Sequence, residues 1–310
     1  MEIWETVLLF LAGLVLIVKG GDWFLSGAVW MAEVTGVPRF LIGATVVSLV
    51  TTLPELAVSV MGVLEGETEL AVSNAVGSVT ANLGLILGLS VSCAPAETKG
   101  QEFALKAVLM SAAAVILTGL CRRGQLRLLP GLLLAGVFAL YLWSTAKDAR
   151  RSLGKRENSS TGAGRKLLAF GVGISAVILG SRLLIDHGSA LARLCGVPAG
   201  VVGATVVAVG TSLPELVTTL TALVKGEAAL SIGNIIGANV IDLTMILPVC
   251  AAVSGGSLPI GRQTRLLDLP ICLVLCLLSV VPTLVEGKFR RWQGVVLLGV
   301  YGAYTAALVL

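Results

Sequence analysis

Charged residues are scarce in this chain, and that scarcity determines which solvent must surround it. Of its 310 residues, 13% are charged and 56% are hydrophobic, whereas an ordinary soluble domain is about 25% charged. Such a chain cannot cover a globular surface with polar groups, so its outer surface must face lipid. Because a helix needs about 20 apolar residues to cross the hydrocarbon core, the length allows roughly ten crossings and little else.

The usual signals of nucleic-acid binding, redox chemistry and transition-metal binding are also missing. The chain has one histidine, and its six cysteines form no CxxC pair; we interpret the cysteines as small residues of the apolar core. The net charge of +4 comes from short basic clusters between apolar stretches, as is typical of membrane proteins. We therefore expect no nucleic-acid partner and no cofactor, and the sequence gives no indication of an oligomeric state.

Ten apolar segments separated by polar turns predict an all-α membrane protein. They cover residues 3–33, 39–64, 68–92, 104–121, 128–146, 166–194, 199–224, 228–253, 267–285 and 292–310. The first lacks a basic leader and is too long for a signal-peptide core, so we expect a mature first helix. The longest polar stretch lies centrally, and we predict a first five-helix repeat over 1–146, a cytoplasmic linker over 147–165 and a second repeat over 166–310.

The two halves of the chain repeat each other at an offset of 160 residues. The stretch GVPRFLIGATVVSLVTTLPEL (36–56) aligns with GVPAGVVGATVVAVGTSLPEL (196–216), and the match continues without a gap. From 36 to 87, 21 of 52 pairs are identical, including prolines and carboxylates. Because five crossings is an odd number, the second half must enter the membrane from the opposite side. Inverted repeats of this kind are typical of secondary transporters, whose site lies at the repeat interface.

The distribution of basic residues predicts an orientation in the cell membrane. With the N-terminus outside, the inward-facing loops and their flanks hold 14 Lys or Arg residues against 6 on the outer side. Cytoplasmic loops carry such an excess of basic residues. We therefore expect a multi-pass protein with both its N- and C-termini outside.

Two glutamates, Glu55 and Glu215, occupy equivalent places deep in apolar segments. A charge at the bilayer centre costs at least about 2.5 kcal/mol on insertion scales, so such a carboxylate is a functional candidate by default. The alternative is a structural ion pair, for which Lys19 and Arg182 are the deep candidates. Each glutamate follows a proline, which removes a backbone donor and opens the helix. Open backbone in a membrane is tolerated only where it faces protein or a water-filled cavity.

Neutral oxygens surround both glutamates in the sequence. Hydroxyl groups lie one turn before them, at Thr51, Thr52, Thr211 and Ser212. Carboxylate, carbonyl and hydroxyl oxygens without sulfur or imidazole select hard cations such as calcium and sodium. Magnesium demands a tight octahedron and keeps its water, so a flexible cage of protein oxygens suits calcium better.

A second pair of polar clusters follows in the third and eighth segments. Its members are Asn74, Gly77, Ser78 and Asn82 in the first half, and Asn234, Gly237, Asn239 and Asp242 in the second. Ser78 and Asn82 are four residues apart and share a helix face. The clusters either extend the cation site or hold helices together, because glycine and small polar residues also serve helix packing in membranes.

The doubled motif GATVV…T-[TS]-LPEL, followed by N-x-x-G-x-x-x-x-[ND], resembles the two alpha-repeats of the sodium/calcium exchanger family. The resemblance covers nearly the whole chain. It implies ten transmembrane helices with long tilted first and sixth helices, and broken helices 2, 3, 7 and 8 that form a core with four clustered cation sites.

The resemblance also implies a ligand set by position. The calcium site would use Glu55, Glu215 and the carbonyls of Thr51 and Thr211, with Asn82 and Asp242 completing the middle layer. A sodium site on the cytoplasmic side would be lined by Ser48, Thr51, Thr52 and Ser78. A second, on the outer side, would be lined by Ala208, Thr211 and Ser212.

Three positions depart from the family pattern. Ala238 stands where relatives usually carry a serine of the outer sodium site, so one hydroxyl ligand is missing there. Val79 replaces a common asparagine, and Val50 replaces the glycine kept at Gly210. Asn82, rather than aspartate, is similar to potassium-independent members of the superfamily.

The predicted function is sodium/calcium antiport by alternating access at a shared carboxylate site. The alternative in the same superfamily is a calcium/proton antiporter. An enzyme is not expected, because an intramembrane aspartyl protease needs two catalytic aspartates and a lipid-phosphate enzyme needs Asp-rich metal motifs. A passive channel would leak calcium without any counter-ion.

Overall fold

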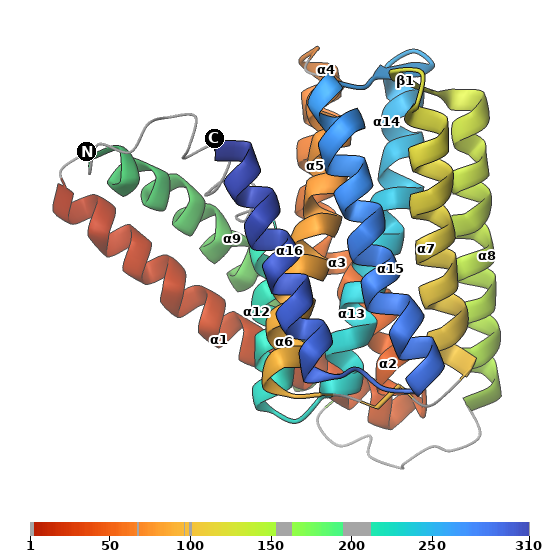
Figure 1. Cartoon of the computed structure of the whole chain (residues 1–310). Helices are drawn as coiled ribbons and strands as arrows, with labels where there is room; N and C mark the ends of the chain where they lie inside the picture. The colour runs from red at the N-terminus through yellow and green to blue at the C-terminus, as the bar shows by residue number, and fades with distance from the viewer. Residues whose placement is uncertain are drawn as a thin grey trace.

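The computed structural model describes residues 3–66, 68–95, 97–98, 101–152, 163–194 and 212–309. These residues are almost entirely helical (Figure 1). The α-helices are α1 (Ile3–Thr35), α2 (Arg39–Ile42), α3 (Ser48–Thr51), α4 (Leu53–Leu64), α5 (Thr68–Ala81), α6 (Gly88–Cys93), α7 (Gln101–Cys121), α8 (Leu128–Ser152), α9 (Ala163–Leu194), α12 (Leu213–Val224), α13 (Ala228–Ile241), α14 (Leu247–Val253), α15 (Leu269–Glu286) and α16 (Arg291–Val309). Four π-helices, η1 (Gly43–Val47), η2 (Asn82–Leu87), η4 (Asp242–Ile246) and η5 (Thr264–Asp268), are inserted between them.

Within the described residues, seven helical stretches are long and apolar enough to cross a membrane. An eighth is the bent pair formed by Arg39–Thr51 and Leu53–Leu64, whose two parts meet at 40°. The chain is therefore a multi-pass membrane protein. The two other predicted crossings correspond to α12, whose preceding segment 195–211 lies outside the described residues, and to α16.

The third and eighth spans are continuous, which corrects the expectation that they are broken. Each runs through a π-helix instead, so that 71–93 and 228–253 are single spans. No proline lies within 82–87, so its backbone donors remain available and the helix widens without breaking. In the eighth span Pro248 has no N–H to donate to the carbonyl oxygen four residues earlier. The π-helix just before it, η4, lets the span continue without a break.

The central linker is shorter than the polar stretch of the sequence suggests. Helix α8 continues to Ser152 and α9 begins at Ala163, so both ends of the predicted 147–165 linker are helical. The basic residues Arg150 and Arg151 occupy the last turn of α8, where cations interact favourably with the helix dipole.

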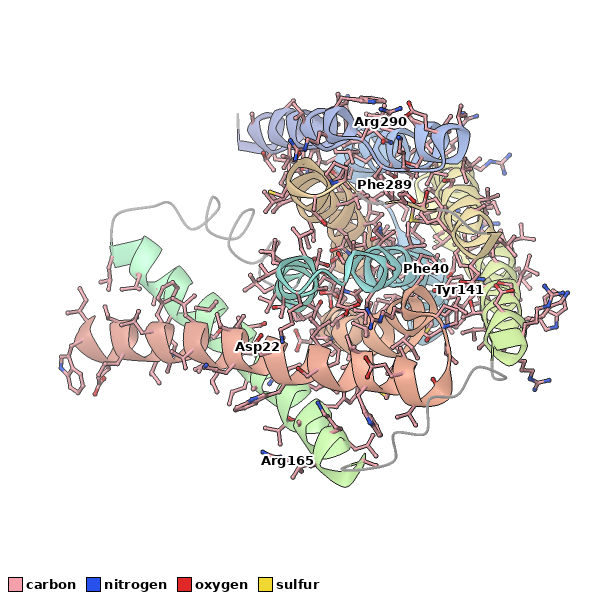
Figure 2. The ribbon with its side chains drawn as sticks, turned by 90° about the horizontal axis from the view of Figure 1, so that it is seen from below. Asp22, Phe40, Tyr141, Arg165, Phe289 and Arg290 are labelled. Atoms are coloured by element: carbon pink, nitrogen blue, oxygen red, sulfur yellow. The ribbon has the colours of Figure 1, made fainter. Side chains whose placement is uncertain are left out.

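Helices α1 and α9 form a pair at the side of the main helical body. The two run alongside each other, while the other helices pack together as a bundle (Figure 1). Figure 2 shows the pair from below, with Asp22 on α1 and Arg165 near the start of α9. Glycines permit their close approach: a Cβ at Gly173 would lie 2.4 Å from the backbone nitrogen of Phe24, and one at Gly180 would lie 2.8 Å from the Gly13 carbonyl oxygen.

Helix α13 lies at the centre of the main body and packs against α2 and η1. The crossing depends on glycines, because a Cβ at Gly233 would lie 2.1 Å from the Phe40 carbonyl oxygen and one at Gly43 would lie 2.2 Å from that of Leu230. Gly237, predicted as a member of the polar cluster, belongs to the same seam, since its Cβ would meet Ala44 and Ser48. The backbones therefore meet directly, as small residues allow in membranes.

Two short strands join the ends of helices at one end of the bundle. Strand β1 (Gln125–Arg127) pairs antiparallel with β2 (Ser257–Pro259). The turn between α4 and α5 lies at this end, because Glu69 Oε2 is 2.9 Å from where a Cβ at Gly261 would stand. At the opposite end the turn after α12 is tied to α1 and α2, with Lys225 Nζ 2.9 Å from Asp22 Oδ1 and Arg39 Nη1 2.7 Å from Glu227 Oε1.

Candidate cation-binding site

Glu55 and Glu215 occupy the same local structure in the two halves. Each lies in the first turn of a helix, α4 or α12, with a proline just before it and Thr52 or Ser212 at the N-cap position. Proline favours this position, where its missing N–H would in any case be unpaired. The partial positive charge of the helix N-terminus stabilises a carboxylate placed there. Both glutamates are 1% exposed, so this stabilisation acts away from water.

The polar residues of the third and eighth spans also adopt matching structure. Asn82 begins η2 and Asp242 begins η4, and both are buried. A π-helix turns its side chains relative to the α-helix around it, and such bulges are frequent at functional sites. Equivalent residues of the repeat are thus presented by equivalent irregularities of the backbone.

Hydrogen bonds join the two copies of the motif directly. Thr52 Oγ1 donates to Glu215 Oε1 at 3.4 Å, and Thr51 Oγ1 donates to Asn234 Oδ1 at 3.3 Å. One layer away, Asn82 Nδ2 donates to Asn239 Oδ1 at 3.1 Å. Segments about 160 residues apart in the chain therefore line one buried polar centre.

Most oxygens of this centre have no hydrogen-bond partner within the described part of the chain. The unpartnered atoms are both carboxylate oxygens of Glu55 and of Asp242, Oε2 of Glu215, Oδ1 of Asn82, and the hydroxyl oxygens of Ser78 and Ser212. Buried polar atoms in folded proteins are nearly always satisfied, and leaving them unpaired is costly. A concentration of unsatisfied oxygens in the middle of a membrane protein is what a cation-binding site requires.

The carboxylates interact with one another rather than with basic side chains. Glu55 lies near enough to Glu215 and Asp242 for their charges to repel, and Asp242 lies near enough to Glu215 for the same repulsion. None of the ion pairs among the described residues involves any of the three, so the structural ion-pair alternative with Lys19 or Arg182 is not observed there. The Ser212 hydroxyl lies close enough to act on Glu55, although it falls outside hydrogen-bonding geometry.

Carboxylates alone do not form a closed metal cage here. The described residues contain no group of three or more His, Cys, Asp or Glu side chains arranged to hold a metal ion. Any cation at this centre must therefore be bound by the two glutamates together with neutral oxygens, which is the mixed ligand set typical of calcium and sodium.

The structure places the remaining predicted residues as follows. Ser48 is buried and donates to the Thr45 carbonyl oxygen at 3.2 Å. Its hydroxyl faces α13, because it lies 2.4 Å from where a Cβ at Gly237 would stand. Thr51 lines a small cavity with about 10 Å³ of space for water between α1, α9 and α12, which Phe24 and Pro214 also line. Ala208 and Thr211 lie outside the described residues.

Comparison with known proteins identifies the family of the chain that contains this buried centre. The chain matches the profile described as sodium/calcium exchanger protein over residues 5–146 and 165–310. The chain belongs to the sodium/calcium exchanger family. Its similarity to the solved structure of the sodium–calcium exchanger NCX_Mj, soaked with Na⁺ and Sr²⁺, has a TM-score of 0.87 at 28% identity and covers 99% of each chain.

Curated relatives of the exchanger family agree over nearly the full length. The sodium/calcium exchanger MaX1 of Methanosarcina acetivorans is 28% identical and is aligned over 97% of each chain. An uncharacterized membrane protein of Methanocaldococcus jannaschii is 30% identical over 96% of each chain. The inner membrane protein YrbG of Escherichia coli is 31% identical, with 81% of this chain covered. The resemblance expected from the doubled motif is confirmed, and the chain is a multi-pass member of a cation-exchanger family.

The hydrogen bonds of Asn74 and Asn234 bear on the two interpretations of the polar clusters. Asn74 Nδ2 donates to Ser59 Oγ at 3.0 Å and to the Glu55 carbonyl at 3.3 Å, while Asn234 bridges Thr51 and Thr218. Both asparagines therefore connect the span that carries them to the helix that carries a glutamate. Holding helices together is the role that their contacts support.

Three residues that contact the carboxylate centre or its supporting helices were not predicted as part of it. Thr218 and Ser59 receive the amide hydrogen bonds of the two asparagines, and Tyr141 on α8 donates its hydroxyl to the Ala44 carbonyl in η1. Thr218 aligns with a valine in the other half, so the repeat did not mark it as one of a matched pair. The sequence feature that could have indicated Thr218 and Ser59 is a hydroxyl residue about one turn after each glutamate.

Proposed function

We propose that the chain is a secondary antiporter that exchanges sodium for calcium by alternating access at a shared intramembrane site. The observation that carries the proposal is the group of buried, unpartnered oxygens on Glu55, Glu215 and their neighbours. Two carboxylates whose charges act on each other in a low dielectric repel when no cation is bound. Calcium neutralises both charges at once, and several sodium ions in flanking sites do the same.

Competition for the same carboxylates couples the two ions. Since calcium and sodium cannot occupy the shared oxygens together, one must leave before the other is bound. If the site opens alternately to the two sides of the membrane, occupancy by different ions on each side results in exchange. We propose that α1 and α9 slide across the bundle as one unit to open and close the site.

The assignment of individual ligands follows the same proposal. Glu55, Glu215 and the backbone carbonyls of Thr51 and Thr211 bind calcium, with Asn82 and Asp242 in the middle layer. The cytoplasmic-side sodium ion is bound among Ser48, Thr51, Thr52 and Ser78. The outer sodium ion is bound beside Ala208, Thr211 and Ser212.

The proposed membrane topology has ten crossings in two inverted repeats of five, with the N- and C-termini outside. It is supported by the directions of α4 and α12, which run from the site to opposite ends of the bundle (Figure 1). The excess of basic residues in the loops at the end that carries the linker supports the orientation.

The test of this function is calcium uptake into proteoliposomes that contain the purified protein. A sodium gradient at clamped pH is expected to drive uptake of radioactive calcium, and collapse of that gradient with a sodium ionophore is expected to stop it. Uptake that proceeds equally without sodium would exclude sodium coupling.

A second candidate, a calcium/proton antiporter, is favoured by one feature. Ala238 is fully buried in α13, where relatives usually carry a hydroxyl of the outer sodium site, so sodium has one ligand fewer. The same vesicles with a proton gradient and no sodium discriminate between the two functions. Calcium uptake under that condition would support proton coupling.

A further inference from the structure

A cluster of arginines lies at the end of the bundle where α7 stops and α8 begins. Arg122, Arg123 and Arg127 fall within six residues around strand β1. They border a cavity of about 390 Å³ whose other lining residues are Gly119, Leu120, Gln125 and Pro130. This cluster is far in the fold from the glutamates, and exchange at the carboxylate site makes no use of it.

The strand pairing fixes where these arginines stand. Leu126 pairs with Leu258 across the β1–β2 ribbon and is fully buried, so its neighbours on β1 point outward. The side-chain oxygen of Gln125, in the amide orientation that satisfies both partners, accepts from Arg127 Nη2 at 3.1 Å and Nε at 3.3 Å. Arg265 from η5 reaches over the same turn, with its Nη1 3.5 Å from where a Cβ at Gly124 would be.

No acidic side chain in the described part of the chain forms an ion pair with this cluster. None of the ion pairs found among the described residues includes Arg122, Arg123, Arg127 or Arg265, and no carboxylate is among the residues that line the cavity. Arginine is also unexpected at this end, which is opposite the basic linker. Three guanidinium groups that line a cavity, with a fourth from Arg265 beside the adjacent turn, attract an anion.

The surface next to the cavity identifies which anion this is. Leu129 is 81% exposed, and Leu132 and Leu133 on the following turn of α8 are also exposed. In a membrane protein, exposed leucines along a spanning helix face the hydrocarbon chains of lipid. The arginines therefore stand where an apolar helix surface meets water, which is the depth of lipid headgroups.

We propose that this cavity binds the phosphate of an anionic phospholipid, whose chains lie along the exposed leucines of α8. Guanidinium groups bind phosphate through paired, charge-assisted hydrogen bonds, and the attached chains gain apolar contact that a free phosphate ion lacks. The proposal is independent of which cations the carboxylate site carries.

The test measures lipid binding to the purified full-length protein by native mass spectrometry, with phosphatidylglycerol and phosphatidylcholine as probes. The wild type is expected to retain phosphatidylglycerol preferentially. The variant Arg122→Gln/Arg123→Gln/Arg127→Gln is expected to bind it roughly a hundredfold more weakly, since each interfacial basic residue contributes about a fivefold change. Unchanged preference in this variant would overturn the proposal.

Two further variants separate the site from general charge and from misfolding. Lys147→Gln/Arg150→Gln/Arg151→Gln removes three charges at the other end of α8 and is expected to leave this binding unchanged. Gly119→Leu places an apolar side chain at the cavity without a change of charge. Because a Cβ at Gly119 meets nothing within 4 Å, we expect the fold to be kept while binding falls. Equal loss in the Lys147 variant, or full binding in Gly119→Leu, would contradict the assigned site.

A parallel arm replaces lipid with inorganic phosphate and follows thermal unfolding in a neutral detergent. We expect little protection from inorganic phosphate up to millimolar concentration, and clear protection from phosphatidylglycerol that the arginine variant lacks. Equal protection by both, with the same dependence on the arginines, would show a free-anion site and overturn the lipid assignment.

Discussion

The span that carries Asp242 and the first helix use the membrane in opposite ways. In the apolar stretch of the 228–253 span, 83% of the residues are buried inside the protein. The corresponding share is 22% for α1 and 29% for its partner α9. Protein surrounds the 228–253 span, so its polar groups are shielded from lipid. Helix α1 exposes most of its surface to lipid and contacts the main helical body along one side. The chain thereby combines an enclosed polar centre with a helix pair that contacts the rest of the protein over a small part of its surface.

Glycines serve both regions but meet different neighbours. In the centre they bring α13 against the backbone of α2 and η1, which is itself enclosed by other helices. In the α1–α9 pair they bring two helices together that have lipid on their remaining sides. An added methyl group must therefore disturb the centre, whereas the pair can separate.

The largest expected effect concerns the charge of the centre. Glu55→Gln or Glu215→Gln is expected to abolish sodium-driven calcium uptake in proteoliposomes, because the neutral amide removes one of two charges that balance calcium. Calcium should also cease to raise the unfolding temperature of either variant.

The matched control for that prediction is a glutamate on the surface. Glu286→Gln disrupts only an exposed pair with Arg290, which contributes little to stability, and uptake should remain normal. If either buried variant exchanged calcium at the wild-type rate, the carboxylate site would be wrongly assigned.

The next effect tests how rigid the centre is. Gly233→Ala places a Cβ 2.1 Å from the Phe40 carbonyl oxygen, so the backbones must separate inside a packed region. We expect a loss of about 1–3 kcal/mol in the free energy of unfolding, measured by thermal or denaturant unfolding in detergent. Gly171→Ala, whose Cβ meets nothing within 4 Å, should instead leave stability unchanged or raised.

A smaller loss of stability is expected in the α1–α9 pair. Gly173→Ala places a Cβ 2.4 Å from the Phe24 backbone nitrogen, but the two helices have lipid beside them and can move apart. We expect the exchange rate to fall several-fold while the unfolding temperature changes less than in Gly233→Ala. Equal destabilisation of both variants would mean that the pair is as rigid as the centre.

The smallest effect concerns one hydroxyl in the centre. Ala238→Ser supplies the ligand that this chain lacks, and the sodium concentration for half-maximal exchange should fall by about fivefold if the oxygen contributes as much as one hydrogen bond. The control Ala238→Cys has similar size but a soft ligand that suits sodium poorly. The same sodium dependence in all three proteins would place Ala238 away from any sodium ion.

Much of the centre could be predicted because the sequence presents it twice. The second copy of a Pro–Glu pair indicated that Glu55 and Glu215 are equivalent, and the structure gives both the same first-turn position. Asn82 and Asp242 were paired in the same way, and each begins a π-helix. A polar residue that recurs at the same place in both apolar halves indicates a chemical requirement, because chance composition does not repeat in register.

Contacts that depend on tertiary packing could not be predicted in this way. Tyr141 recurs as Tyr301 at the 160-residue offset, but its contact with the Ala44 carbonyl depends on how α8 packs against η1. The buried pair of Lys106 and Asp148 likewise joins α7 to α8, although both residues lie in basic or apolar surroundings in the sequence. Widened helices were also missed, because a π-helix has no proline or glycine signature to distinguish it from a broken one.

The opposed directions of α4 and α12 have an electrical consequence. Both helices begin at the buried carboxylate centre, and their peptide dipoles point toward opposite faces of the membrane, so along the membrane normal the two contributions largely cancel. A transmembrane voltage acts on each elementary charge with about 2.3 kcal/mol per 100 mV. We therefore expect the voltage to act on the transported ions more than on the helices α4 and α12. The charge that crosses the membrane per transport cycle, measured as current, should then equal the net charge of the ions carried.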